Sequence, residues 1–294
     1  MTLKQINNLR PGRLRALTGM TVKALGELLA TVLPELAKRR EQTKRARADR
    51  QRAVGGGAKR QLAPAQEVLL VLIYLRHNVA HEVVGHLFGV SADLSENLFH
   101  ELVPLLRELL PANRFVAEHR FRREGPTLTV EKTDRILIDS FETAIPRPSK
   151  PERQKRLYSG KKKRHTLKTQ VVTDVTGEVL EVDAGHRGPA ADKTIYEASE
   201  VKAHFPQAAK QADLGYLGTD GVETPHRKPR GGHLTEAQRE ENRQRARVRV
   251  HVEHGIRRLK GFKIVRENYR HAIGLFPRVV AAVVGLVHLN RILL

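Results

Sequence analysis

The sequence predicts an α/β protein in which an all-helical region precedes a domain of alternating strands and helices. Apolar residues recur at helical spacing between residues 62 and 110. From Thr127 the pattern changes to short runs rich in β-branched residues, which is typical of strands. The later elements follow in the order strand, hairpin, helix, strand and helix, and this order favours a three-layer α/β domain.

The chain is expected to divide into three regions. Residues 1–61 form a basic N-terminal helical arm, residues 62–113 a helix-turn-helix domain, and residues 127–294 the α/β domain. Within the arm, residues 37–60 hold ten Lys or Arg and include Gly55-Gly56-Gly57, a pattern typical of a basic helix followed by a hinge. Such a segment either follows the phosphates of a polyanion or presents a solvated charged face.

Three helices are predicted in the second region, at residues 68–75, 81–88 and 94–110, the last kinked at Pro104. The break Phe88-Gly89-Val90-Ser91 supplies a glycine for a tight turn and a serine to cap the next helix. This combination of a turn glycine and a capping serine indicates a helix-turn-helix.

The third of these helices begins with Asp93 and Glu96, whereas a helix that reads the DNA major groove normally offers Arg, Lys, Asn or Gln there. Asn97 and His100 are its candidate base contacts. Packing or dimerisation is an equally open role for this helix.

In the third region, Arg135-Ile-Leu-Ile-Asp139 predicts a short strand that closes on an acid. Residues 167–173 and 178–182, joined through Gly177, predict a hairpin. A helix is expected from Ala191, and a weaker strand ends at Ala212-Asp213.

The C-terminal part is expected to be helical. A capping box from Thr235 to Gln238 begins a long helix. The longest apolar run, residues 279–287, is too short to span a bilayer and predicts a buried C-terminal helix.

Charge and cysteine content narrow the function classes. The chain has 294 residues, 53 Lys and Arg against 32 Asp and Glu, a formal charge of +21 and no Cys. The charge predicts a nucleic-acid partner, and the absence of Cys excludes disulfides, thiolate nucleophiles and zinc-cysteine fingers. No signal peptide is recognisable, so we expect a cytoplasmic, nucleoid-associated protein that does not enter a membrane. With 8 Phe, 5 Tyr and no Trp, few rings are available for stacking on single-stranded bases, which disfavours an RNA-binding role.

Three acids stand where they would converge in an α/β fold. Asp139 and Asp213 end neighbouring strands, and Glu253 lies on the long helix between Arg249 and Lys260. The helical acid has a simpler interpretation, because Arg249, Glu253 and Arg257 would also form surface ion pairs. If the acids converge, oxygen-only ligands select Mg²⁺ or Mn²⁺, and two such ions would suit an in-line phosphoryl transfer.

Four motifs in this order resemble DDE-type insertion-sequence transposases, with the insertion-sequence-five family and its Harbinger-like relatives as the closest group. They are Ile138-Asp-Ser-Phe-Glu-Thr-Ala-Ile-Pro-Arg-Pro148, Tyr158-Ser-Gly-Lys-Lys-Lys-Arg-His-Thr-Leu-Lys168, Asp213-Leu-Gly-Tyr216 and the Arg-x3-Glu-x6-Lys of the long helix. The resemblance covers most of the chain. It implies a DNA transposase with a ribonuclease-H-like fold, a mixed sheet flanked by helices.

The resemblance also implies roles for particular residues. Asp139, Asp213 and Glu253 are the expected catalytic triad and metal ligands for Mg²⁺ or Mn²⁺, with two ions expected. Asp192 competes with Asp213 for the second position, and otherwise serves as an auxiliary ligand or helix cap. Basic residues are expected to contact DNA: Lys161, Lys162, Lys163, Arg164, Lys168, Arg227, Lys228, Arg230, Arg249 and Lys260.

The expected activity is metal-dependent cleavage at the ends of the element, followed by strand transfer into target DNA. The partners are double-stranded DNA, namely terminal inverted repeats and target DNA, and a second copy of the chain in a homodimer or larger synaptic complex. Two departures from the family pattern, Phe141 and Ala246, support an alternative. In it, the chain is a catalytically inactive or domesticated DNA-binding protein.

Overall fold

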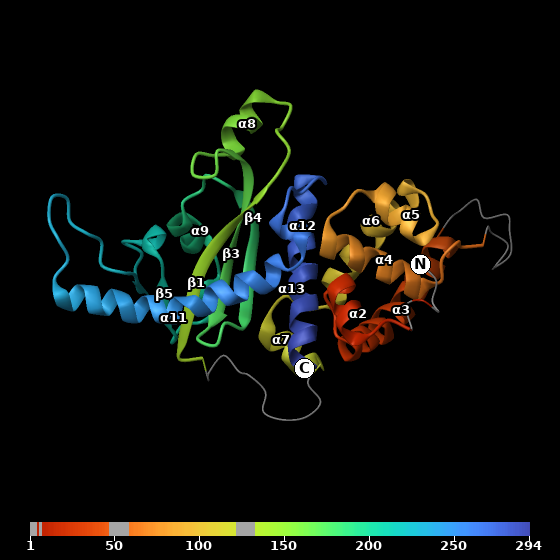
Figure 1. The fold of residues 1–294 in the computed structure, drawn as a ribbon, viewed down its shortest axis with the longest axis horizontal. Coiled ribbons are helices and arrows are strands. Elements are labelled where there is room, and N and C mark those ends of the chain that lie inside the picture. The colour runs from red at the N-terminus through yellow and green to blue at the C-terminus, as the bar shows by residue number, and fades with distance from the viewer. Residues whose placement is uncertain (1–4, 6–7, 47–58, 122–132) are drawn as a thin grey trace.

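The computed structural model describes residues 5, 8–46, 59–121 and 133–294. The predicted hinge at residues 55–57 and the predicted domain start at Thr127 lie outside these residues. A helical region and an α/β region lie side by side, with the C-terminal helix α13 (Phe276–Ile292) between them (Figure 1).

The helical region contains α2 (Pro11–Thr18), α3 (Val22–Arg45), α4 (Pro64–His77), α5 (His81–Phe88), α6 (Ala92–Leu109) and α7 (Arg114–Phe121). The predicted turn is confirmed in detail. Gly89 ends α5 in the left-handed conformation, and the Ser91 side chain accepts a hydrogen bond from Leu94 N at the start of α6. Pro104 lies inside α6.

The described part of the N-terminal segment packs onto this region. The apolar face of α3, including Leu28, Val32 and Leu36, is buried in the same core as α4 and α6. On its polar face, Arg40 forms ion pairs with Glu67 at 2.7 Å and Glu101 at 2.6 Å. At Arg40, therefore, the basic stretch binds the protein itself, which neither interpretation of the sequence anticipated.

A mixed sheet forms the centre of the α/β region, which confirms the expected class. Its strands are β1 (Arg135–Ala144), β2 (Tyr158–Ser159), β3 (Arg164–Asp174), β4 (Val179–Arg187), β5 (Ala209–Ala212) and β6 (Val222–Glu223). β3 lies between β4 and β1 and is antiparallel to both, whereas β5 and β6 continue the sheet in parallel beyond β1. β2 pairs with the start of β3.

The first strand is longer than predicted, and Asp139 lies at its middle. β1 continues to Ala144 because its whole length pairs with β3, from Ile136 opposite Asp174 to Ala144 opposite Thr166. In the second half of the strand, Phe141 packs into the core, and the buried Thr143 hydroxyl donates to Val265 O at 2.5 Å. The expectation that the strand ends at Asp139 is therefore wrong.

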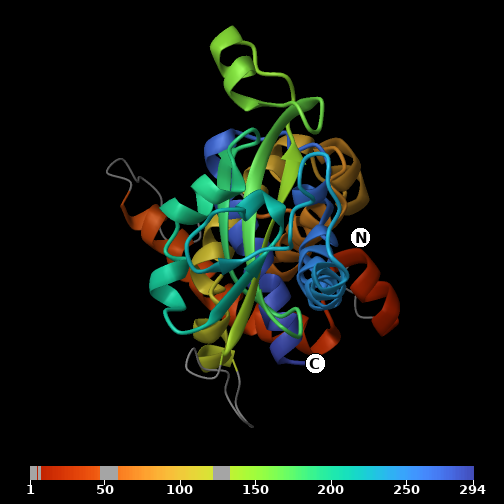
Figure 2. The same ribbon diagram turned by 90° about the vertical axis from the view of Figure 1, so that its left-hand side faces the viewer.

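Helices cover both faces of the sheet (Figure 2). Ile136 and Ile138 face a small core shared with α9 (Asp192–Ala198) and α10 (Val201–His204). Leu137 and Phe141 face the main core, which includes residues of α11 (Glu236–Lys260), α12 (Lys263–Arg266) and α13. Because side chains alternate along a strand, Asp139 belongs to the α11 side and Ser140 to the α9 side.

The long helix α11 crosses the sheet where two glycines allow close approach. Its start is the predicted capping box, with Thr235 and Gln238 bonded reciprocally. Gly177, at the β3–β4 turn, has φ +81°, and a Cβ there would collide with the His251 carbonyl oxygen. A Cβ on Gly255 would lie 2.7 Å from Thr173 Cγ2 and 3.0 Å from Gly177 O. The hairpin tip and α11 are therefore in backbone contact.

The C-terminal helix is buried as predicted. The helical stretch Ile273–Ile292, which includes the 3-10 turn η3 (Ile273–Leu275), is long and apolar enough to cross a membrane, yet 67% of its apolar window is buried inside the protein. Near its end, the Asn290 amide donates to Gly19 O and its oxygen accepts from Thr21 N at 2.9 Å. The C-terminal helix thus closes onto the turn between α2 and α3.

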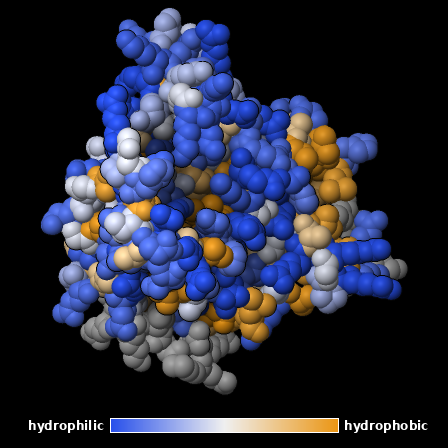
Figure 3. Space-filling view, turned by 60° about the vertical axis from the view of Figure 1, so that its left-hand side comes forward, coloured by the Kyte–Doolittle hydropathy of each residue, from blue (hydrophilic) through white to orange (hydrophobic). Residues whose placement is uncertain are grey.

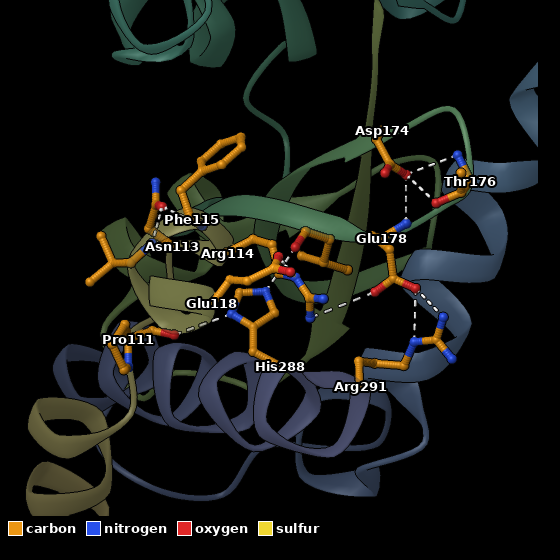
Figure 4. Close-up of polar contacts among 12 residues, drawn as sticks. Pro111, Asn113, Arg114, Phe115, Glu118, Asp174, Thr176, Glu178, His288 and Arg291 are labelled. Atoms are coloured by element: carbon orange, nitrogen blue, oxygen red, sulfur yellow. Dashed lines mark hydrogen bonds and ion pairs between the residues drawn. The ribbon is translucent and has the colours of Figure 1, made fainter. Parts of the chain in front are cut away.

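A polar network lies where α7, α11, α13 and the β3–β4 turn meet (Figure 4). The Glu178 carboxylate accepts from Arg291 Nε at 2.8 Å and lies 3.9 Å from Arg114 and 3.7 Å from Arg258. His288, which is fully buried, lies beside Arg114, with Nε2 2.8 Å from Val179 O and Nδ1 3.2 Å from Pro111 O. The network joins the hairpin tip to three helices.

Candidate active site

Asp139 lies on β1, and Asp213 directly follows the neighbouring strand β5. The parallel pairing of β1 with β5 sets Ile138 opposite Ala212, so the residue after each member of this pair is an acid. Asp213 leaves the sheet to cap the 3-10 turn η2 (Leu214–Tyr216), and its Oδ1 accepts from Gly215 N at 2.8 Å. The structure brings these two predicted acids together as the sequence predicted.

Asp192 approaches the same place from the other face of the sheet. It is the first residue of α9, and its Oδ1 accepts from Ser140 Oγ at 2.6 Å and lies 3.1 Å from Lys168 Nζ. A Cβ on Gly215 would lie 2.8 Å from Asp192 Oδ2 and 2.9 Å from Asp213 Oδ1, so the two carboxylates flank that glycine. Of the two, Asp192 already has a cation beside it.

Glu253 lines the same pocket as Asp139. The pocket has a volume of about 510 Å³, and Lys260 and Arg257 also line it. In the described part of the chain, no ion pair joins Glu253 to Arg249 or Arg257, and its side chain is exposed. Arg249 instead lies with Nη2 3.7 Å from Asp139 Oδ2. The interpretation of this helix as a surface ladder of ion pairs does not hold at Glu253.

Negative charge accumulates around Asp139. Burial, reinforced by the carboxylates of Asp213 and Asp192, raises the pKa of Asp139 to about 6, although the Ser140 N–H and Arg249 oppose this rise. Burial and the same acids raise the pKa of the Tyr216 hydroxyl, which has no hydrogen-bond partner within the described residues. A cation bound beside Asp139 would reduce the repulsion among these carboxylates.

The donor set fits a hard divalent cation. Carboxylate oxygens surround Asp139, the chain has no Cys, and the repulsion around Asp139 calls for positive charge. Within the described residues, the ligand atoms of Asp139, Asp213 and Glu253 are not all within 4.8 Å of one another. The residues that would hold the metal are these three, with Asp192 beside them.

Most of the predicted DNA-contacting residues are exposed. Lys161, Lys162 and Lys163 form the turn before β3, next to Arg164, and Arg227, Lys228 and Arg230 lie in the loop before α11. The face shown in Figure 3 is mostly hydrophilic and includes the protrusion that carries α8 (Pro151–Leu157). Lys161 and Lys162 line a second pocket of about 400 Å³, which shares Ser140 and Lys260 with the first.

Three other predicted contacts have partners within the protein. Lys168 is only 7% exposed, and its ammonium donates to Ala190 O at 2.6 Å besides its pairing with Asp192. Arg249 faces Asp139. Lys260 lies over the Phe141 ring at 5.0 Å, and burial together with Lys162 lowers its pKa.

The candidate base contacts lie on α6. Asn97 and His100 are both exposed, but most of α6 is a core helix that packs against α4, α5 and α13. His100 Nε2 lies 3.8 Å from Glu96 Oε1.

Sequence reasoning missed Ser140 as a site residue. Its N–H donates to Asp139 Oδ1 at 2.7 Å and its hydroxyl donates to Asp192, so one residue orients two acids on opposite faces. The alternation of side chains along β1 was the available signal.

Comparisons with known proteins agree with this geometry. A family model described as DDE superfamily endonuclease matches residues 138–288, and one described as helix-turn-helix of DDE superfamily endonuclease matches residues 60–112. A probable transposase for insertion sequence element IS702 from Microchaete diplosiphon is 31% identical over 249 residues, 81% of this chain and 85% of that protein. A putative transposase for insertion sequence element IS112 from Streptomyces albus G is 31% identical over 217 residues, 73% and 76% of the two chains.

No solved structure matches the chain. None of these matches tests the assignment to the insertion-sequence-five group, which stays a prediction.

Proposed function

Because this chain belongs to the DDE superfamily endonucleases, we propose that it is an insertion-sequence transposase that cuts DNA at the ends of its element and joins them to target DNA. The observation that carries the proposal is the grouping of Asp213 and Asp192 around Asp139, with Glu253 on the same pocket. Divalent-metal use follows from the family, and we propose Mg²⁺ or Mn²⁺, two ions per site, from the oxygen donors.

Different side chains would have different roles in phosphoryl transfer. Asp139, Asp213 and Glu253 would hold the ions, and Asp192, already paired with Lys168, would assist. When bound, the ions would polarise the scissile phosphate and lower the pKa of the attacking water or 3′-hydroxyl. Arg249 compensates part of the charge on Asp139.

Basic residues would position the DNA. Lys162 and Lys260 line the pockets next to the acids, where a phosphate would be drawn in. The exposed turn at residues 161–163 and the loop at residues 227–230 would follow the duplex backbone, which fixes register without reading sequence.

No covalent protein intermediate is needed. Tyr216 is fully buried and its pKa is raised, so its hydroxyl is a poor nucleophile. Tyr158 is exposed, but it lies on β2, away from the residues that flank Asp139.

The test uses DNA that carries the inverted repeats of the element. With Mg²⁺, we expect cleavage that leaves a 3′-hydroxyl at the element end. Asp139→Asn, Asp213→Asn and Glu253→Gln should each reduce the rate on the order of a thousandfold and leave DNA affinity within about twofold. Asp192→Asn should reduce it less, and the exposed Asp220→Asn serves as the matched control.

Normal cleavage by both Asp139→Asn and Glu253→Gln would refute the assignment. DNA binding without cleavage and without divalent-ion affinity would instead identify the non-catalytic DNA-binding alternative.

Joining two ends requires two active sites, so we propose a homodimer or larger assembly on DNA. Sedimentation of the protein with and without end DNA measures the stoichiometry. One protein chain on each paired-end complex would contradict the proposal.

A further inference from the structure

We propose that Glu96, His100 and His271 bind a first-row transition-metal ion, Zn²⁺ foremost, at a site separate from the acids around Asp139. Glu96 and His100 lie one turn apart on α6, and His271 lies in the loop before η3. One ligand atom from each residue lies within 4.8 Å of the others, and no other His, Asp or Glu triple in the described ranges meets that condition. The site joins two regions that are distant in sequence.

His271 is held in the orientation that a ligand requires. Its ring stacks on Phe99 with the centroids 4.1 Å apart and the planes 17° from parallel. The Tyr74 hydroxyl lies 2.7 Å from His271 Nε2. A tyrosine hydroxyl both donates and accepts, so it can accept from Nε2–H when a metal is held at the other ring nitrogen, Nδ1. The Tyr74 hydroxyl is thus placed as the outer partner that metal-bound histidines commonly have.

The two ligands on α6 are available to a metal. Glu96 and His100 have side chains 54% and 47% exposed, and they lie 3.8 Å apart, beyond hydrogen-bonding distance. The His100 ring stands nearly perpendicular to that of His271, with centroids 5.8 Å apart. An open site with two imidazoles and one carboxylate leaves coordination positions for water, which is a common arrangement for zinc.

A third imidazole, that of His81, lies beside the proposed ligands, with its ring centroid 5.6 Å from that of His271. The His81 ring stacks on the Tyr74 ring, with the centroids 4.1 Å apart. His81 Nδ1 forms a hydrogen bond with Ser95 Oγ at 2.9 Å. Its Nε2 is buried and has no hydrogen-bond partner within the described residues. The cluster therefore holds a further imidazole nitrogen beside the proposed site.

Donor chemistry separates this site from the first one. Two imidazoles select Zn²⁺, Co²⁺, Ni²⁺ or Cu²⁺ over Mg²⁺, whereas the carboxylates around Asp139 favour Mg²⁺ or Mn²⁺. Since the chain has no Cys, no thiolate competes for zinc. Excess Mg²⁺ should occupy the acids without displacing zinc from the histidines.

The bound metal would tie the helix-turn-helix to the catalytic region. Glu96 and His100 lie within the residues matched by the helix-turn-helix model, and His271 lies within those matched by the endonuclease model. A metal that engages His100 also removes it from the base contact expected of it.

The experiment titrates full-length, chelator-treated protein with ZnCl₂ in excess Mg²⁺, by calorimetry. We expect one equivalent to bind, and Glu96→Gln and His100→Ala, both exposed changes, to weaken binding at least about tenfold. His86→Ala, an exposed histidine of the neighbouring α5, should bind as the wild type does. Co²⁺ in place of Zn²⁺ should give visible absorption that His100→Ala loses.

Because His271 packs on Phe99, His271→Gln is compared by thermal melting. Zn²⁺ should raise the melting temperature of the wild type and of Asp139→Asn, but not that of His271→Gln. Zinc binding that Glu96→Gln and His100→Ala leave unchanged, or no binding, would overturn the proposal. Neither outcome depends on the Asp139 site, because Asp139→Asn is tested in parallel.

Discussion

The Asp139 carboxylate is kept where ionisation is unfavourable. It is largely buried and shares its surroundings with Asp213 and Asp192, and its pKa is raised to about 6 from 3.8. Above that pKa the folded, metal-free protein carries a charge that the unfolded chain would carry more easily in water. Asp139 therefore lowers the stability of the metal-free folded protein, and its buried charge attracts a cation.

Replacing Asp139 with Asn should stabilise the metal-free protein at pH 7.5. The carboxamide keeps the shape and removes the charge, so we expect a gain of about 1–3 kcal/mol in the free energy of unfolding. Urea denaturation in the presence of a chelator measures it. Asp220→Asn, an exposed change, should have no effect, and a less stable Asp139→Asn protein would contradict the prediction.

The sequence predicted that Asp139 and Asp213 belong to neighbouring strands, and they meet because each follows a residue of the Ile138–Ala212 pair. The roles of Lys168 and Arg249 were not predictable in the same way. Both look like free cations in a basic chain, and only the register of β3 and the rotation of α11 turn them toward Asp192 and Asp139. Side-chain direction near a sheet depends on pairing, which local sequence does not specify.

At the scale of elements, α11 is positioned by the tip of the β3–β4 hairpin. Gly177 and Gly255 let the backbone of the β3–β4 turn contact α11 at a point two residues after Glu253. Nearby, the Arg258 side chain donates a hydrogen bond to Gly177 O. The distance from α11 to the sheet therefore decides how far Glu253 lies from Asp139.

Gly255→Ala should displace α11 and weaken catalysis. Its Cβ would contact Thr173 Cγ2 and Gly177 O too closely, so we expect about 1–3 kcal/mol of destabilisation and a fall in cleavage larger than any fall in DNA affinity. Gly26→Ala in α3, where a Cβ meets nothing within 4 Å, is the control and should stabilise by about 0.5–1 kcal/mol. Unchanged stability in Gly255→Ala would exclude the tight packing.

The attachment of α3 rests on Arg40. It pairs with Glu67, which is only 2% exposed, whereas Arg39 pairs with the exposed Glu108. Arg40→Ala should destabilise by about 3 kcal/mol, because a buried carboxylate loses a partner, although Arg60 remains beside it. Arg39→Ala should cost less than about 1 kcal/mol. Equal effects in thermal unfolding would show that burial of Glu67 does not matter.

The starts and ends of elements that carry local signals were more predictable than the full length of β1 or the packing of α3. The cap at Ser91, the turn at Gly89 and the box at Thr235 have local signatures, and each lies where predicted. β1 runs past Asp139 because β3 pairs with it, and α3 packs inward because its apolar face meets α4 and α6. Both are tertiary effects that a single segment does not encode.

Across the whole molecule, His288 lies at the junction between the sheet and the helical region. Burial lowers its pKa to about 4 from 6.5. A neutral imidazole donates one hydrogen bond, and the shorter contact, to Val179 O at 2.8 Å, is the one it favours.

Acidification should weaken the fold through His288. Between about pH 6.5 and 4 the unfolded chain binds a proton that the folded protein excludes, so stability falls as the pH falls. From pH 7.5 to pH 5 we expect this residue alone to remove about 2 kcal/mol. His288→Gln should show a shallower loss in urea denaturation at the two pH values, and the exposed His86→Gln should lose as much as the wild type. An identical loss in His288→Gln would contradict the prediction.

The position of α13 has a consequence for synthesis on the ribosome. Its residues follow both regions in the chain, yet they pack against α6, α7 and β4 and hydrogen-bond to the chain around Gly19. Until α13 has been synthesised, the helical region has an exposed apolar face. The face of the sheet that α13 packs against is also partly uncovered. A product that ends before α13 therefore leaves apolar surface uncovered in both regions. Only translation through α13 completes the two cores.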